Sequence, residues 1–294
     1  MAYNKITLNG ETKIDLTQDT VTAEDVVAGK TFHLNSGETA VGTLEVSSGG
    51  GEFFDRTFAN NTPEQIAQVS ALISYNNMTS EQVASTYGWN IGDTISYQLT
   101  TGENVEMRII GFNHDNKSDG RGTAGITLQT VNLLRTKYSM NSSNTNAGGY
   151  PASKIKLQTL PAIKATLPQE WQNVIKMVDK KSANGGGSNY SEIVTTSEDL
   201  FLLSELEVFA TVTKAQNGGH EGKAYEYWIN NDSNPARTKK YDANNDGVPE
   251  TGDMWWLRSS VNKYTDYFCI VSTSGGASYD DAKNARGVSF AFCI

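Results

Sequence analysis

Cysteine, histidine and proline are scarce in this sequence, and so is positive charge. Two cysteines are too few for the disulfide framework of a small secreted domain. With 24 Lys and Arg against 33 Asp and Glu, the net charge is −9, and the basic residues form no stripe that could follow a phosphate backbone. No apolar run approaches the roughly 20 residues that cross a bilayer. We therefore expect neither a nucleic-acid partner nor insertion into a membrane.

A secretory signal is also missing. The opening MAYNKITLNGETK has no apolar core and no small-residue cleavage site. We expect the protein to be made and folded in a cytoplasm. In that reducing compartment Cys269 and Cys293 are expected as buried free thiols rather than as a disulfide.

Catalytic motifs are absent as well. His33, His114 and His220 sit in unrelated segments with no nucleophile motif around them, so we expect them at the surface. Glu205 and Glu207 alternate in an apolar run, which favours a structural hydrogen-bonding role. The Gly-rich stretches lack the Lys-Thr or helix start of a phosphate loop. No catalytic residue is expected.

What the sequence does contain is polar, uncharged and aromatic. Charged residues make up only 19%, while 27 Gly and 13 Tyr are present, a balance typical of β-rich binding proteins. Alternating and amphipathic runs together predict an α+β fold, with an antiparallel sheet and helices gathered to one side.

The pattern divides the chain into three parts. Residues 1–46 predict a hairpin, a short helix at 22–29 and a second hairpin. A unit this small buries little core by itself, which favours self-association. The Gly/Ser-rich stretch 47–52 is expected as a linker, and residues 53–294 as the ligand-binding domain.

Helices and strands alternate within residues 53–294. Thr62 carries the capping-box signature of a helix start, and a second helix is expected over 79–88. A hairpin is expected over 94–112. A long helical section over 152–181 is expected to pack an apolar face on the sheet, formed by Trp171, Val174, Ile175 and Val178.

An acidic loop, DANNDGVPETGD, occupies residues 242–253. Its spacing matches the EF-hand pattern, in which oxygens at alternating positions surround Ca²⁺. Pro249 and the non-helical flanks speak against this, and a solvated acidic loop is the alternative. No cofactor is otherwise required. The candidate ligands of a structural Ca²⁺ are Asp242, Asn244, Asp246, Val248 through its carbonyl, and Asp253.

Residues 254–294 place a polar stretch between two apolar, strand-like runs. Ser, Asn, Asp, Tyr and Gly dominate the stretch, which includes Tyr264, Tyr267 and Tyr279. Rigid aromatic rings among adaptable polar side chains are the composition of antibody paratopes. The alternative is an ordinary polar surface loop.

Longer stretches carry a resemblance to a known family. Residues 53–294 resemble a domain common in phage tail proteins and bacterial surface proteins of the gut, through FLLSE, WWLRS, SMNSSNTNAGGYPASKIK and GVSFAFCI. The N-terminal DLTQDTVTAEDVVAGKTFHLNSGETAVGTL is similar to short modules of phage tail fibres. Together these resemblances imply a phage tail-tip protein, carried on the virion tail and homotrimeric through residues 1–46.

The segment of about 259–290 is also similar to the variable region of a diversity-generating retroelement. In such a system template adenines are mutated, so that an AAC codon for Asn yields Asp, Ser, Tyr, Gly or Arg but never Lys. Lys263 and Lys283 are therefore either fixed positions or evidence against variation. The candidate ligand-binding residues, all reachable by this mutation, are Asn262, Tyr264, Asp266, Tyr267, Ser272, Ser274, Gly276, Ser278, Tyr279, Asp280, Asp281, Asn284 and Arg286.

This resemblance implies a C-type lectin-like fold for residues 53–294. Its framework residues are expected to hold the sheet while the polar positions between them vary: Phe268, Ile270, Val271, Val288, Phe290 and Phe292. The implied function is non-enzymatic binding of a bacterial surface protein or glycan, in company with other phage tail proteins. The alternatives are a bacterial surface adhesin, a structural tail component, and a formylglycine-generating-like or glycan-processing enzyme on the same scaffold.

Overall fold

The computed structural model describes residues 5–8, 11–15, 22, 31–41, 53–186, 192–215, 218–244 and 246–294. The chain divides into two compact units, Met1–Phe54 and Asp55–Ile294. This division falls close to the boundary expected at residue 53. The expected linker at 47–52 and, apart from Thr22, the expected helix at 22–29 lie outside the described residues.

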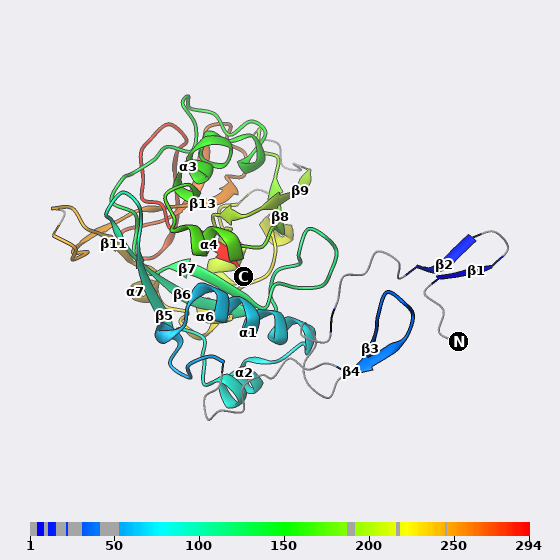
Figure 1. The fold of residues 1–294 in the computed structure, drawn as a ribbon. Helices are drawn as coiled ribbons and strands as arrows, with labels where there is room; N and C mark the ends of the chain where they lie inside the picture. Colours follow the sequence, from blue (N-terminus) through cyan, green and yellow to red (C-terminus); the bar gives the residue numbers. More distant parts are fainter. Residues whose placement is uncertain are drawn as a thin grey trace. The chain divides into compact units, whose positions relative to one another are not determined.

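Two antiparallel hairpins make up most of the described part of the first unit (Figure 1). β1 (Lys5–Leu8) pairs with β2 (Glu11–Asp15), and β3 (Thr31–His33) pairs with β4 (Thr39–Val41). The second hairpin turns at Gly37, whose φ of 81° is a conformation that only a residue without a Cβ adopts readily. Both hairpins confirm the sequence prediction.

The second unit is built around a five-stranded antiparallel sheet in the order β10-β16-β7-β6-β5. Its strands are β5 (Thr94–Gln98), β6 (Asn104–Phe112), β7 (Ile126–Thr130), β10 (Leu200–Phe201) and β16 (Ala291–Cys293). β7 is buried along its whole length, and Phe292 of β16 lies opposite its Leu128. β16 therefore sits inside the sheet, between two strands from much earlier in the chain.

The first two helices begin where the sequence predicts. The Thr62 hydroxyl accepts a hydrogen bond from the backbone N–H of Gln65, and the N–H of Thr62 donates to Gln65 Oε1, which forms the capping box. Among the residues that the structure describes, no helix combines the length and the apolar character that a bilayer-spanning segment needs. The α-helices are α1 (Pro63–Tyr75), α2 (Ser80–Tyr87), α3 (Leu160–Lys164), α4 (Gln169–Val174), α5 (Glu205–Phe209), α6 (Glu226–Asn230) and α7 (Asn234–Arg237).

Helices cover both faces of the main sheet. Trp171 of α4 packs edge-on against Phe292, with ring centroids 5.9 Å apart. Trp228 of α6 donates from its indole N–H to Gln129 at 3.1 Å. Phe292 pairs with Leu128, and neighbouring residues of a strand point to opposite faces, so α4 and α6 lie on opposite faces. The prediction of helices on one side is therefore wrong.

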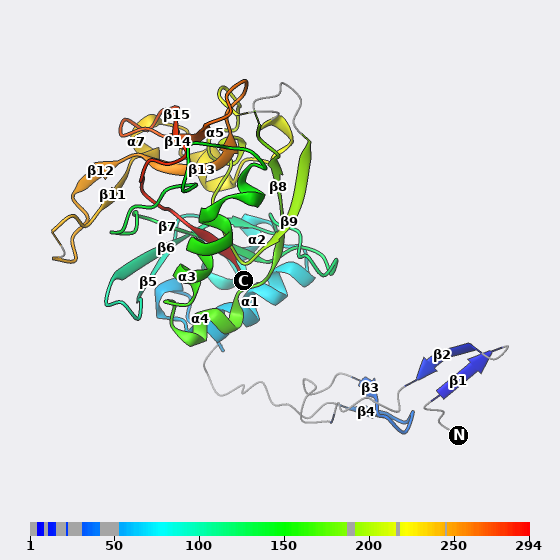
Figure 2. The ribbon, with the colours of Figure 1, turned by 90° about the horizontal axis from the view of Figure 1, so that it is seen from above.

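Smaller antiparallel sheets complete the second unit. β13 (Trp255–Ser260), β14 (Tyr267–Val271) and β15 (Ala277–Asp281) form a three-stranded sheet with β14 in the middle and β15 at the edge (Figure 2). β8 (Val178–Ala183) pairs with β9 (Ile193–Glu198), and β11 (Lys239–Tyr241) pairs with β12 (Thr251–Asp253). The predicted α+β class is confirmed, but several small sheets replace the single sheet that was expected.

The helical section predicted over 152–181 is shorter than expected. Trp171 and Val174 are buried on α4, as predicted, but Val178 begins strand β8. β8 alternates buried and exposed side chains, and two of its buried residues, Lys180 and Ser182, are polar. Because the buried face carries polar residues, the hydrophobic pattern of this segment does not show the period of a strand.

Candidate functional site

The C-terminal ribbon, residues 255–286, carries all thirteen candidate ligand-binding residues on β14, β15 and the loops around them. Every one of the thirteen is exposed or half-buried. The residues expected to form the framework are all buried: Phe268, Ile270, Val271, Val288, Phe290 and Phe292. Within this segment the accessible positions thus lie on both sides of a buried run, residues 268–271 of β14.

Three tyrosines gather at one end of the ribbon. Tyr264 and Tyr267 have ring centroids 5.2 Å apart, Tyr267 and Tyr279 5.1 Å, and Tyr264 and Tyr279 5.9 Å. Tyr264 is 46% exposed and Tyr279 39% exposed. The carboxylates of Asp266 and Asp281 raise the pKa of Tyr267, because a negative phenolate beside them is unfavourable. The cluster is an accessible aromatic platform with acidic neighbours.

The register of the strands explains why these rings meet. Tyr267 pairs with Asp281, and Cys269 pairs with Tyr279, so Tyr267, Tyr279 and Asp281 point to the same face of the ribbon. The loop before β14 turns at Lys263, whose φ is 66°. The sequence pattern identified the three tyrosines, but only the pairing shows that they touch.

Asn146 holds the loop that carries Tyr264. Its side chain is completely buried and donates from Nδ2 to the carbonyls of Tyr264 at 2.8 Å and Tyr267 at 3.0 Å. Its Oδ1 accepts the backbone N–H of Gly186 at 2.9 Å, and its own N–H donates to Thr265 O at 2.7 Å. Sequence reasoning missed this residue, because a lone Asn among many in the stretch 141–146 gives no signal.

A second group of candidates points to the other face of the ribbon. Asp280 pairs with Phe268, one position along from Tyr279, so its side chain turns away from the tyrosines. It forms an ion pair with Arg286 and accepts from Asn284 Nδ2 at 2.9 Å. The ion pair therefore holds Arg286 on the face of the ribbon opposite the three tyrosines. Asp280, Asn284 and Arg286 form a group of their own.

The turn between β14 and β15 forms a third group, made of Ser272, Ser274 and Gly276. The two serine hydroxyls lie 3.0 Å apart, and Ser272 Oγ accepts the N–H of Gly276 at 3.0 Å. A Cβ added at Gly276 would meet nothing closer than 3.6 Å, whereas one at Gly275 would lie 1.6 Å from Asn234 O. Position 276, a candidate, thus has room for a side chain, and position 275 does not.

Four candidates remain outside these groups. Asp266 is half-buried, and its carbonyl accepts the N–H of Ala282 at 2.8 Å. Asn262 is exposed, and its backbone N–H donates to Lys214 O at 3.0 Å. Asp281 accepts from Asn144 Nδ2 at 2.6 Å, which ties β15 to the loop that also carries Asn146. Ser278 is half-buried and lies opposite Ile270. The thirteen residues therefore form a band along one ribbon rather than the lining of one pocket.

The acidic loop 242–253 links β11 to β12. Asp242 accepts the backbone N–H groups of Asp246 at 3.2 Å and Gly247 at 2.9 Å, and Asp246 accepts from the N–H of Val248 at 2.8 Å. Asn244 donates to Asp246 Oδ2 at 3.1 Å. These side chains stabilise the turn itself, so their oxygens already have donors.

Asp253 lies apart from that turn. It pairs with Lys239 in the hairpin and contacts Lys137 Nζ at 2.5 Å. Within the described ranges no group of three or more His, Cys, Asp or Glu is placed to hold a metal ion. The calcium site stays a prediction, and hydrogen bonds from the loop's own backbone N–H groups to Asp242 and Asp246 stabilise its turn.

Glu205 and Glu207 have the structural role predicted, although they lie on helix α5 rather than on a strand. Glu207 caps the helix by accepting the N–H of Ser204 at 3.0 Å. Glu205 accepts the backbone N–H groups of Thr213 at 3.0 Å and Ala215 at 2.6 Å. It thereby fixes the loop that carries Lys214 beside Tyr279.

The histidines differ from the prediction of three surface positions. His33 is exposed, but the side chain of His114 is only 9% exposed and stacks on Tyr225, with ring centroids 3.8 Å apart. His114 and His220 come from distant segments and line the same cavity. No local motif could show this meeting, since it depends on the tertiary fold.

Both cysteines, which lie in the described part of the chain, are free and buried, as predicted. They lie in different sheets, Cys269 in β14 and Cys293 in β16. Burial raises the pKa of each thiol well above its usual value, and the nearby Glu205 and Asp115 respectively raise it further. Neither thiol has the lowered pKa of a reactive cysteine.

Comparison with known protein families finds a match that includes the C-terminal ribbon. Residues 126–294, more than half of the chain, match the family described as a domain of unknown function, DUF6273. The chain belongs to this family. The matched segment contains the main-sheet strands β7, β10 and β16 and the whole C-terminal ribbon. Neither a curated protein nor a solved structure matches the chain.

Proposed function

We propose that this protein is a non-enzymatic, receptor-binding protein of a phage tail tip, whose C-terminal ribbon binds a bacterial surface protein or glycan. The observation that carries the proposal is the contrast between the candidate positions and the strand that anchors them. Thirteen residues suited to diversification are accessible, while the framework residues Phe268, Ile270 and Val271 of β14 are buried. Exposed positions tolerate substitution at a cost of about 0.5 kcal/mol or less, so such a surface can vary while the fold stays constant.

We further propose that the second unit has a C-type lectin-like arrangement. Supporting this, the chain has a small antiparallel sheet in the ribbon and a main sheet in which the late strand β16 lies between β10 and β7. The same framework suits an adhesin or an enzyme. The raised pKa values of Cys269 and Cys293 speak against an oxidative cysteine enzyme, because the thiolate is the reactive form.

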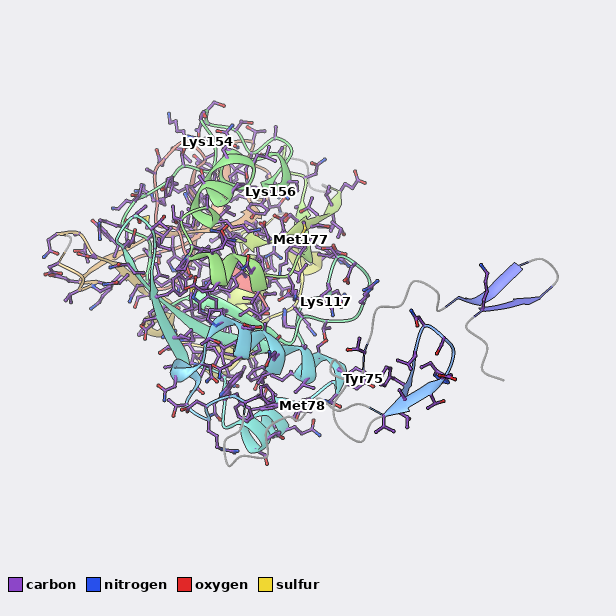
Figure 3. The ribbon with its side chains drawn as sticks, viewed as in Figure 1. Tyr75, Met78, Lys117, Lys154, Lys156 and Met177 are labelled. Carbon is purple, nitrogen blue, oxygen red and sulfur yellow. The ribbon has the colours of Figure 1, made fainter. Side chains whose placement is uncertain are left out.

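The contacts expected to dominate binding are the three clustered tyrosines and Arg286, since Tyr and Arg are enriched among interface hot spots. The test compares the full chain with a variant that carries Tyr264→Ala, Tyr267→Ala and Tyr279→Ala. We expect binding to cells of the host bacterium to weaken at least about 30-fold, which corresponds to about 2 kcal/mol. Tyr75→Ala is the matched control, because Tyr75 is 87% exposed on α1 (Figure 3).

Each other outcome favours a different function. Unchanged attachment together with failed tail assembly would favour a structural tail component. Expression of the gene from a bacterial chromosome, with the protein on the cell surface, would favour an adhesin. A near-copy of the codons for 259–290 in the neighbouring DNA, differing mainly at adenines, would support diversification directly, and its absence would remove that part of the proposal.

We propose that the first unit makes the protein a homotrimer. Its described hairpins are short, and the β3–β4 hairpin exposes Val41 to 54%. Several linked sites also gain from avidity, by about 10²–10⁴-fold. Light scattering should give a mass of three chains of 32.0 kDa, and a monomer at micromolar concentration would contradict the assembly.

A further inference from the structure

The C-terminal ribbon has one edge that is covered by other backbone and one that is open. β13 forms the covered edge, because Arg258 N–H donates to Leu203 O at 2.8 Å and Trp256 N–H donates to Gly287 O at 3.1 Å. β15 forms the other edge, and among the described strands it pairs with β14 alone. A strand at the edge of a sheet presents backbone N–H and C=O groups with which another strand can pair.

Hydrogen bonds at the two ends of β15 show which of its backbone groups face outwards. Ser272 N–H donates to Gly276 O, and Ala282 N–H donates to Asp266 O, each at 2.8 Å. In an antiparallel pair, residues that bond to the partner strand alternate with residues whose N–H and C=O point away from it. By this alternation, the residues of β15 that point these groups away from β14 are Ala277, Tyr279 and Asp281.

Two of these three residues leave their outward groups unpaired. Asp281 is satisfied locally, because its N–H donates to Asp280 Oδ1 at 2.9 Å and its carbonyl accepts the N–H of Asn284 at 2.9 Å. The N–H and C=O groups of Ala277 and Tyr279 have no hydrogen-bond partner within the described part of the chain. Four unpaired groups therefore lie along this edge, on residues that are about 6.8 Å apart, which is the two-residue repeat of an extended peptide.

The chain already pairs backbone with the ribbon directly after β15. Asn141 N–H donates to Ala282 O at 2.9 Å, and Tyr138 exchanges two N–H···O bonds with Arg286, both at 3.0 Å. Within the described residues, the segment 138–146 makes no backbone hydrogen bond to β15 itself. Backbone pairing thus stops at Ala282, and the edge of β15 beside it is left to another strand.

We propose that β15 pairs with an extended peptide segment of a bacterial surface protein, which adds a fourth strand to the ribbon. This inference rests on the proposed function and narrows its ligand to a protein, because a peptide backbone matches the four unpaired groups. A glycan chain does not present N–H and C=O groups at this repeat. When a strand is added to a sheet edge, main-chain hydrogen bonds supply affinity and the side chains supply specificity.

The three tyrosines then select among peptide sequences. Neighbouring strands place opposite residues about 5 Å apart, so one side chain of the added strand lies beside Tyr279. Tyr264 and Tyr267 have their rings within 5.9 Å of that tyrosine, and the same side chain therefore meets the whole cluster. Substitutions in the ribbon change the preferred sequence, while the backbone pairing stays the same.

The first test selects ligands from a library of random linear peptides on the full chain. A selected peptide is then synthesised with an N-methyl group at each position in turn. We expect binding to weaken at least about tenfold at every second residue and to change little at the residues between, because only alternate N–H groups face β15. Hydrogen exchange at the Ala277 and Tyr279 amides should slow when the unmodified peptide binds, since both N–H groups gain an acceptor.

The second test blocks the edge in the protein. Ala277→Pro removes one outward N–H and leaves the pairing with β14 and the three tyrosines in place, since proline is tolerated on an edge strand. It should weaken peptide binding at least about tenfold. Ser96→Pro is the matched control, because Ser96 N–H points outwards on β5, the edge strand of the main sheet, and this variant should bind as the unmodified chain does.

The outcomes distinguish this inference from the proposed function. Loss of attachment to host cells in both Ala277→Pro and the triple tyrosine variant, and after proteinase K treatment of the cells, supports both. If the tyrosine variant loses attachment while Ala277→Pro keeps it, or if periodate rather than protease abolishes attachment, the ribbon binds without an added strand and this inference is overturned. It is also overturned if no linear peptide is selected or if N-methylation shows no alternation, and these two results do not depend on the folding of a variant.

Discussion

Arg258 and Glu207 form a bidentate ion pair in the interior of the second unit. Arg258 Nη2 donates to Glu207 Oε1 at 2.8 Å and Nη1 donates to Oε2, and the two side chains are 0% and 1% exposed. The remaining guanidinium donors reach backbone carbonyls, including Leu202 O at 3.0 Å. β13, which leads into the candidate binding loops, is thereby attached to helix α5.

Breaking this pair should destabilise the protein strongly. Glu207→Gln leaves a buried guanidinium without its counter-charge, which is expected to lower the free energy of unfolding by about 3–5 kcal/mol. Urea denaturation followed by tryptophan fluorescence measures the change. Glu170→Gln, at an exposed position on α4, is the control and should stay within about 0.5 kcal/mol. Equal midpoints for the two variants would contradict the role assigned to the pair.

The free energy of unfolding of the second unit should pass through a maximum at about pH 5. Burial raises the pKa of Glu221 from 4.5 to about 7, so the folded state binds its proton more tightly than the unfolded state does. This contribution, about 3 kcal/mol, is complete below pH 4.5 and is lost as the pH rises through about 7. Asp115 and Glu207 have lowered pKa values, so their contribution is lost in acid.

Urea midpoints at about pH 3, 5 and 8 measure these opposite slopes. Glu221→Gln carries a neutral amide in place of the protonated carboxyl and should remove most of the loss between about pH 5 and 8. If that variant and the unmodified chain lose the same stability over this interval, Glu221 is not its cause.

The two glycines of the β14–β15 turn should respond in opposite ways. Gly275→Ala adds a Cβ 1.6 Å from Asn234 O at a φ of 84°, so we expect a loss of at least about 1–3 kcal/mol. Gly276→Ala meets no atom closer than 3.6 Å and should cost about 0.5 kcal/mol or less. Thermal melts of the two variants make the comparison. A tolerated Gly275→Ala would show that the turn is looser than described.

Asn146→Ala should weaken both the fold and the binding face. The change leaves the carbonyl of Tyr264 without its donor, at a cost of about 1–3 kcal/mol, and leaves the carbonyl of Tyr267 with the N–H of Val261 alone. Asn144→Ala is the control from the same loop. Asn144 is exposed, and its side chain donates to Asp281 rather than to the carbonyls of Tyr264 and Tyr267. Amide hydrogen exchange at 264–267 should accelerate in the first variant. Equal protection in both would exclude Asn146 as the anchor.

Both thiols should resist alkylation while the protein is folded. Cys269 and Cys293 are buried and their pKa values are raised, so little thiolate is present at neutral pH. Iodoacetamide followed by intact-mass spectrometry should show no modification until denaturant is added. Rapid labelling of either cysteine in the native protein would reopen the alternative of a cysteine-dependent enzyme.

Local signals in the sequence predicted local structure well. The capping box at Thr62, the helix that ends at Gly88 and the two N-terminal hairpins depend on residues close together in the chain, and all were found. The accessible and buried positions of the C-terminal ribbon were also predicted, because its polar residues and its apolar framework residues can be told apart by composition.

Contacts between distant segments could not be predicted in the same way. Lys180 is buried in β8 only because Asp115 and Glu207 neutralise it, and neither lies near it in the chain. The sequence pattern instead placed Lys180 at the end of a helical section over 152–181. The capping box from Ser204 to Glu207 was present in the sequence and could have identified α5, whereas the pairing of Glu207 with Arg258 had no such signal.

The position of β16 between β10 and β7 has a consequence for the translation of altered copies of the gene. The ribosome must translate residues 259–290 before it reaches 291–293, and the main sheet cannot close around β7 and β10 until β16 has emerged. A stop codon or frameshift introduced within the ribbon removes β16 along with the altered residues. Such a product lacks the strand that joins β10 to β7 and cannot complete the sheet. Under the proposed diversification, only copies whose reading frame is intact throughout the ribbon can therefore present a new surface.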